Sequence, residues 1–218
     1  MGILSFFQPR KEKPTPAESG FRLPEDVLEN ARAIYAGIKK ELSDPETANR
    51  FTEIVTSESP LRDIVAKDIY VPCSILIAEK ALSGVRPEGM LPEIEPLMPG
   101  IDRQTLLRYV RACSSTAMSA LIQVRSERFP VPLYVWKCVK DERSNPAHVA
   151  MDGVICSWKE APTLGDGKLF HPGRAVGCRC RAAVVVDLED VSFPARCFAG
   201  GKIVEAGSPE DIKKVFGL

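Results

Sequence analysis

The first half of the chain shows apolar residues at the three-to-four-residue spacing of amphipathic helices. In one clear case Ile34, Ile38 and Leu42 follow one another at intervals of four, which places them on one helix face. The pattern predicts helices over residues 24–42, 45–57, 60–71, 73–82 and 102–128. Residues 84–101 are punctuated by proline and glycine and are expected to form a connector.

The longest predicted helix opens at Asp102, whose side chain is suited to cap it. Small residues are frequent along this helix, so a neighbouring element can pack closely against it. They are Ala112, Ser114, Ser115, Ala117, Ser119 and Ala120. Earlier in the chain, Pro72 is expected to break or kink the helix over 60–71 before the next one continues.

After Phe129-Pro130 the pattern changes to short runs of β-branched and aromatic residues bounded by turns. These runs predict strands within 131–139, 153–159, 182–187 and 197–205. A helical turn is expected to begin at Asn145-Pro146, and a terminal helix over 209–216 follows Ser208 as its cap.

The predicted fold class is α+β: an N-terminal helical region followed by a small mixed α/β core with short antiparallel strands. The expected organisation has three parts. They are a flexible tail over 1–23, a helical region over 24–128, and an α+β core with a C-terminal helix over 129–218.

Composition narrows the function classes. The 29 basic and 29 acidic side chains cancel, so no net field attracts nucleic acid or an anionic membrane. No apolar run is long enough to span a bilayer, so no membrane contact is expected. The opening MGILSFF lacks the order of a secretory signal, and the odd count of 7 cysteines argues against a closed disulfide framework. Reduced thiols are therefore expected.

Residues of chemical interest are concentrated between positions 136 and 181. They are Trp136, Asp141, Arg143, His148, Asp152, Gly153, Cys156, His171, Cys178 and Cys180. Among them His148, His171, Cys178 and Cys180 supply a complete ligand set for a structural zinc ion, and Cys156 could replace one ligand. The competing interpretation is that the cysteines pack in a small core while the histidines make local hydrogen bonds.

Two other chemistries use the same stretch. Arg179 and Arg181 could favour a thiolate, although consecutive residues of a strand point to opposite faces, so these arginines need not lie beside the sulfurs that they flank. Asp141, Arg143 and His148 could form a small hydrolytic site. The competing interpretation of these residues is structural: an Asp141–Arg143 ion pair or cap fixes a turn, and His148 makes its hydrogen bonds beside it.

The order of these motifs resembles the phage Mu F-like head morphogenesis family, the minor head proteins of tailed phages. The resemblance is carried by Trp136, Asp141-Glu142-Arg143, His148, Asp152-Gly153, His171-Pro172-Gly173 and Cys178-Arg179-Cys180. It covers 131–187 and the preceding helix, whereas residues 1–100 and the last thirty carry no matching motif.

The chain departs from the family pattern at two places. Ser144 and Ala147 stand where many relatives have cysteines, and Arg111-Ala112-Cys113 replaces the usual Arg-Thr-Glu. A metal here would need His148, Cys178 and Cys180 with a fourth ligand from His171, Cys156 or water.

The resemblance implies a structural role rather than an enzymatic one. Expected partners are the portal, major capsid or scaffolding protein, with contact to packaged DNA, and the GILSFF segment could dock on one of them. The expected location is the virion, in the capsid interior or at the portal vertex, and the host cytoplasm during assembly. The alternatives are a metal-dependent hydrolase or nuclease using Asp141, Arg143 and His148, and a toxin or effector delivered with phage DNA.

Overall fold

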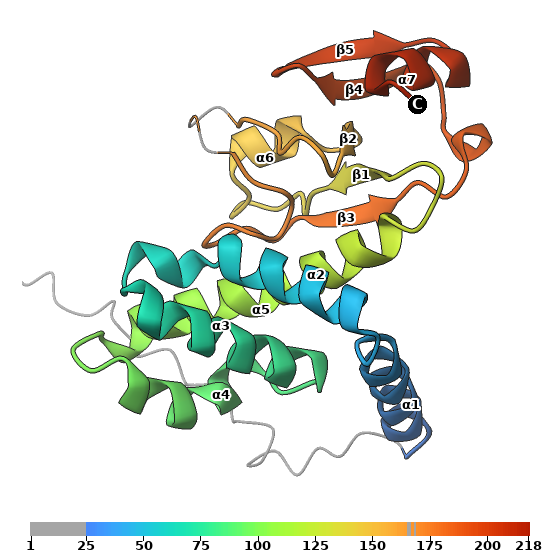
Figure 1. Cartoon of the computed structure of the whole chain (residues 1–218). Coiled ribbons are helices and arrows are strands. Elements are labelled where there is room, and N and C mark those ends of the chain that lie inside the picture. Colours follow the sequence, from blue (N-terminus) through green and yellow to red (C-terminus); the bar gives the residue numbers. More distant parts are fainter. Residues whose placement is uncertain (1–24, 165–166, 168) are drawn as a thin grey trace, which may run out of the picture.

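A computed structural model describes residues 25–164, 167 and 169–218 (Figure 1). The predicted tail over 1–23, with its GILSFF segment, lies outside the described residues. The helices are α1 (Glu25–Glu41), α2 (Pro45–Ser57), α3 (Lys67–Leu82), α4 (Pro87–Ile94), α5 (Arg103–Ser126), α6 (Pro146–Ala150) and α7 (Pro209–Phe216). Short 3-10 turns are η1 (Pro60–Asp63), η2 (Glu95–Leu97) and η3 (Leu188–Asp190). The strands are β1 (Leu133–Lys137), β2 (Ile155–Ser157), β3 (Arg181–Val184), β4 (Ala195–Ala199) and β5 (Lys202–Ala206).

The predicted α+β class is confirmed, with a helical half followed by one sheet. The sheet has the order β3-β1-β2-β4-β5. Its pairings are antiparallel except that β2 and β4 run parallel, so the sheet is mixed. No helix of the described residues is both long and apolar enough to cross a bilayer.

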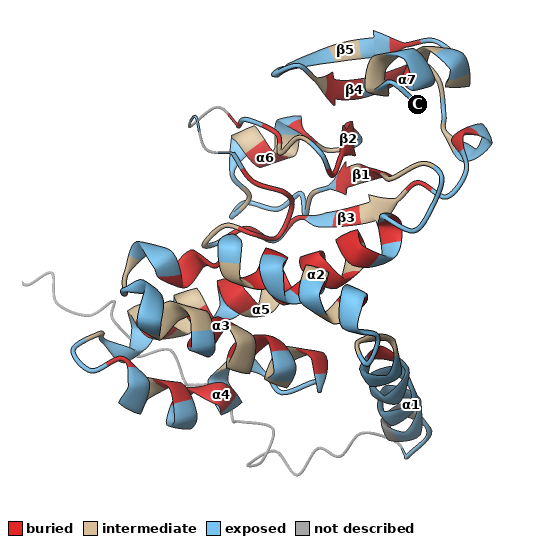
Figure 2. Ribbon diagram, in the orientation of Figure 1, coloured by how far each residue is buried: buried red, intermediate tan, exposed pale blue. Residues whose placement is uncertain are grey.

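Helix α5 is the element around which the helical half packs (Figures 1 and 2). Asp102 caps it as expected, because its carboxylate accepts the Thr105 N–H at 2.9 Å. One stretch of α5 buries Leu106 and Val110 against α3, α4 and η1. The following turns bury Ala117 and Leu121 against α2 and α3. The same helix therefore contributes to two apolar clusters.

Two expectations for the helical half were wrong. The connector over 84–101 contains α4, because Met90, Leu91 and Ile94 recur at helical spacing and are almost completely buried. The predicted helix over 60–71 is instead η1, and α3 begins only at Lys67 and runs through Pro72.

Helix α3 tolerates Pro72 for a physical reason. Proline lacks the N–H that would bond the carbonyl four residues earlier, which belongs to Asp68. Asp68 lies in the first turn and is exposed, so water can satisfy that carbonyl.

The predicted strand over 197–205 was also wrong, since it is a hairpin of β4 and β5. Gly200 and Gly201 form its turn with φ of +58° and +76°. Two successive positive φ values are needed in the tight turn that matches strand twist, and glycine adopts them without a Cβ penalty.

Strand β1 separates the two apolar layers of the sheet. Tyr134 and Trp136 are completely buried on one face, in a cluster that includes Cys178, Cys180 and Phe170. Leu133 alternates to the other face and packs in the cluster containing Ile212 of α7. Among the candidate residues, Trp136, Cys156, Cys178 and Cys180 therefore belong to the cluster on the first face.

Arg174 joins the sheet half to the helices. Its side chain is 0% exposed, and its guanidinium donates to Ser119 Oγ at 3.0 Å, Gln123 Oε1 at 2.6 Å and Glu58 Oε1 at 2.6 Å. The neighbouring Gly173 approaches α5 so closely that a Cβ there would lie 3.0 Å from Ser115 Oγ. The expected close packing on the small residues of α5 is thus confirmed at this loop.

We expect Arg174→Leu to lower the free energy of unfolding by about 3–5 kcal/mol, because it leaves the polar groups that surround the guanidinium without their partner. Urea denaturation followed by circular dichroism measures the change. Arg111→Leu is the control, since Arg111 pairs with Glu88 at an exposed site. That variant should lose about 1 kcal/mol or less. Equal losses in both variants would contradict the assigned role of Arg174.

Candidate metal centre

Three side chains converge beneath the sheet. His148, Cys178 and Cys180 are all buried, and the ligand atoms they offer lie within 4.8 Å of one another. His148 comes from α6, Cys178 from the loop before β3, and Cys180 from the residue directly before that strand. The structure therefore brings together three of the four ligands expected from sequence.

Local turns aim these residues at one point. The Asn145 side chain accepts the Ala147 N–H at 2.9 Å, and Pro146 occupies the first position of α6, so this short helix begins where His148 needs it. In the loop, Gly173 and Gly177 have φ of +86° and +81°. Such values favour glycine and let the chain reverse twice within a few residues.

The donor set fits zinc in type and in spacing. Two thiolates and an imidazole are ligands that zinc takes in structural sites. Tetrahedral zinc with ordinary bond lengths holds a sulfur and a nitrogen ligand roughly 3.6 Å apart. The His148 Nδ1 to Cys180 Sγ distance is 3.5 Å. The group could therefore hold a metal such as zinc with little rearrangement.

Thiolate is already favoured within the pair of cysteines. The hydrogen bond from the Cys180 thiol lowers the pKa of Cys178 to about 6, and the backbone N–H groups of Cys180 and Gly173 act in the same direction. The Gly173 N–H donates to Cys178 Sγ at 3.3 Å. Nearby Cys178 in turn raises the pKa of Cys180. One negative charge is thus stabilised where a cation would bind.

His171 and Cys156 do not belong to this group. His171 Nδ1 lies 2.9 Å from the Tyr134 hydroxyl, and the ring packs against Trp158. Burial, together with the charge of Arg174, lowers the pKa of His171 to about 3. Cys156 is a core residue of β2, and burial raises its pKa to about 12. Both side chains are engaged in the core.

Asp141 and Arg143 occupy a different environment from His148. The Asp141 carboxylate takes a bidentate contact from Arg179 and accepts the Arg143 N–H at 3.0 Å. The contact with Arg179 holds the pKa of Asp141 well below its usual range. The Arg143 guanidinium is 3.8 Å from Asp141 and largely exposed. The bridge-and-cap interpretation of these residues agrees with the structure.

Asp152 and Gly153 also fix the chain. The Asp152 carboxylate accepts the Cys138 N–H at 2.8 Å and pairs with Lys140 at 2.6 Å. Gly153, with φ of +81°, donates its N–H to the Trp136 carbonyl at 2.8 Å. The chain between α6 and β2 is thereby held against the end of β1.

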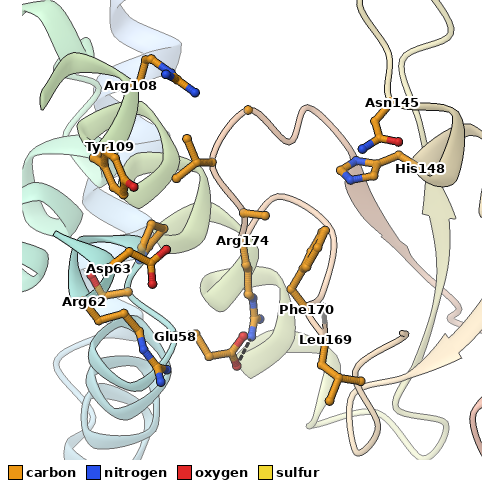
Figure 3. Close-up of a pocket in the computed structure, with 15 residues that line it drawn as sticks. Glu58, Arg62, Asp63, Arg108, Tyr109, Asn145, His148, Leu169, Phe170 and Arg174 are labelled. Atoms are coloured by element: carbon orange, nitrogen blue, oxygen red, sulfur yellow. Dashed lines mark hydrogen bonds and ion pairs between the residues drawn. The ribbon is translucent and has the colours of Figure 1, made fainter. Parts of the chain in front are cut away.

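A cavity of about 690 Å³ lies between the helical half and the sheet half (Figure 3). Glu58 and Arg174 are joined across one part of it, while Asn145 and His148 line another (Figure 3). Asp141 and Arg143 are not among the lining residues. The proposed hydrolytic trio of Asp141, Arg143 and His148 therefore does not share this cavity.

Arg174 is the residue of this region that the sequence did not single out. It stands in a run with Arg179 and Arg181, and nothing in their order separates a buried guanidinium from exposed ones. The preceding Pro-Gly turn and the small residues of the long helix were the available signals, because together they indicate a close approach.

The burial of His171 predicts a specific acid sensitivity. Its folded pKa of about 3 is below the unfolded value of 6.5, so below pH 6.5 only the unfolded chain takes up this proton. Stability is then lost as pH falls toward 3, by up to about 1.4 kcal/mol per pH unit. We expect His171→Gln to remove this contribution.

Urea titrations of both proteins between pH 7 and 4, in chelator so that metal loss does not interfere, measure the effect. The wild type should be the more stable at pH 7, and the gap should narrow as the pH falls. Parallel curves would contradict the assignment.

Comparison with known proteins agrees with the family resemblance that the order of the motifs indicates. The family profile described as phage Mu protein F like protein matches residues 77–183, from within α3 to β3, and so includes the three converging ligands. An uncharacterized protein of Haemophilus influenzae is 35% identical over 74 residues, which are 34% of this chain and 16% of that protein. The chain thus aligns with a small part of that relative. No solved structure matches. Residues 77–183, just under half of the chain, therefore carry a phage Mu protein F-like domain.

Proposed function

We propose that the chain is a minor head protein of a phage or prophage, a structural and assembly component that associates with the portal and capsid. The observation that carries the proposal is the phage Mu F-like domain over 77–183. The protein would act in the virion, in the capsid interior or at the portal vertex, after assembly in the host cytoplasm. Its partners would be portal, major capsid or scaffolding protein, with contact to packaged DNA.

The core supports a structural role. Polar residues that looked available for chemistry are engaged in holding segments together. Asp141 is paired with Arg179, Asp152 is bonded to the end of β1, and Arg174 is enclosed by α5 and Glu58. Charges satisfied within the fold serve rigidity, which a component placed between larger assemblies needs.

The same bonds weigh against the hydrolase alternative. A general base must reach a substrate proton, whereas Asp141 is held by Arg179 and its pKa is lowered by that contact. His148 faces two sulfurs instead of Asp141. No observation favours the delivered toxin or effector.

Helix α1 offers a contact surface for a partner. It stands at one end of the helical half, and every side chain of α1 whose burial is described is exposed except those of Ile38 and Glu41 (Figure 2). Ile38 is buried on the rest of the protein, whereas Ile34, one turn earlier, is 66% exposed and Tyr35 is 38% exposed. An apolar face that begins in the core and continues into solvent is typical of a surface used in association.

The proposal predicts where the protein is found. In a phage or prophage that carries this gene, mass spectrometry of purified particles should detect the chain at a few copies per particle. In-frame deletion of the gene should sharply reduce infectious particles, and expression of the chain in trans should restore them. Two results together would overturn the proposal. The deletion would leave the yield of infectious particles unchanged, and purified wild-type particles would lack the chain.

A single substitution tests the surface on α1. Ile34→Asp places a charge on the exposed apolar face, so incorporation into particles should fall several-fold while the purified chain keeps its thermal stability. Glu29→Lys, an exposed charge change elsewhere on α1, is the matched control and should leave incorporation unchanged. Equal incorporation of both variants would show that this face of α1 does not contact a partner. It would not contradict the proposal that the chain is a minor head protein.

A further inference from the structure

The three converging ligands leave one coordination position undecided. A zinc ion held by three protein ligands keeps an open position for water or substrate, whereas structural zinc is closed by a fourth protein ligand. Because His148 also lines the cavity between the two halves, the fourth ligand decides whether the centre is reactive or structural.

Strand register points to Cys138 as the fourth ligand. Strands β1 and β3 pair antiparallel, with Trp136 opposite Ala182 and Lys137 opposite Arg181. Continuing this register by one residue places Cys138 opposite Cys180. Directly opposed residues have Cβ atoms about 5 Å apart, close enough for two sulfurs to reach one ion.

Side-chain alternation puts Cys138 on the correct face. Trp136 points into the cluster that holds Cys178 and Cys180, and Lys137 points to solvent. Residue 138 returns to the face of Trp136. In agreement, the partly buried Cys138 side chain packs against that same cluster.

The Trp136 indole lies beside Cys180 in the same buried cluster. That indole nitrogen is fully buried and has no hydrogen-bond partner among the described residues. A buried N–H without an oxygen acceptor is well placed to stabilise a sulfur that carries negative charge.

We infer that Cys138, His148, Cys178 and Cys180 form a closed zinc centre, in which Cys138 supplies the fourth ligand and excludes water. Cys138 Sγ now lies 3.3 Å from the Val139 carbonyl oxygen, outside the group of three. A change of its side-chain rotamer would bring it to the ion, while its backbone stays fixed by Asp152. The centre would tie the end of β1 to α6 and to the start of β3.

The test compares three candidates for the fourth position in the full chain. Cys138→Ala, Cys156→Ala and His171→Gln are each stripped with chelator and titrated with Zn²⁺ and with Co²⁺. The wild type should bind one equivalent. Cys138→Ala should bind zinc about 100-fold or more weakly, because even outer partners of a ligand are worth 10–100-fold.

The cobalt spectrum counts sulfurs directly. Cys138→Ala should lose about one third of the thiolate-to-cobalt absorption, since two sulfurs remain of three. Cys156→Ala and His171→Gln should keep the wild-type spectrum and affinity. Absence of metal binding by the wild type, or an unchanged spectrum in Cys138→Ala, would overturn the inference.

A measurement on the wild type avoids the risk that a variant fails to fold. Cys138 is partly exposed, so an alkylating reagent should modify it quickly in the metal-free protein and slowly in the zinc-loaded protein. Mass spectrometry of the Cys138 peptide gives both rates. Equal rates would overturn the inference, and none of these outcomes bears on whether the chain is found in phage heads.

Discussion

The architecture depends on one buried cation. The Arg174 guanidinium has lost its hydration, a change that is unfavourable unless every donor finds a partner. Its partners come from separate parts of the chain: Ser119 and Gln123 on α5, and Glu58 after α2. Trp158 lies 5.3 Å from the guanidinium carbon and covers it from the sheet side. Helices and sheet must therefore be assembled together for the charge to be satisfied, and this couples the two halves energetically.

The position of Arg174 also sets the geometry of the candidate metal centre. Gly173, next to it, is pressed on Ser115 and gives its N–H to Cys178. The same short loop thus contacts α5 on one side and presents sulfur on the other. Displacing the loop from α5 would move Cys178 relative to His148, because that histidine is held by the separate anchor of α6. The contact of this loop with α5 consequently also fixes the position of Cys178 relative to His148.

Much of the fold could be predicted from local signals, and the two elements that were missed both contain glycine or proline whose local role was misjudged. Asp102, Asn145 and Ser208 cap their helices as their side-chain chemistry indicates. Helix α4 was missed because proline and glycine hid three buried apolar residues, and the hairpin was missed because Gly200-Gly201 was not taken as a turn. For the site, His148, Cys178 and Cys180 could be identified from residue type alone. His171 is the same residue type as His148, but its ring is hydrogen-bonded to Tyr134. Only the tertiary structure shows which of the two histidines lies beside the cysteines. Cys138 becomes visible only once strand register is known.

The contrast between His148 and His171 shows how the fold distributes its polar groups. Both rings are buried beside aromatic side chains, yet one faces sulfur and the other faces a phenol. The His171 ring is surrounded by Tyr134, Trp158 and Arg174, and this environment disfavours any further positive charge. A cation would be repelled there by Arg174, whereas the lowered pKa of Cys178 favours a negative charge beside His148. The two histidines therefore differ in environment because the buried arginine lies beside His171, and of the two only His148 stands in a group that could hold a metal such as zinc.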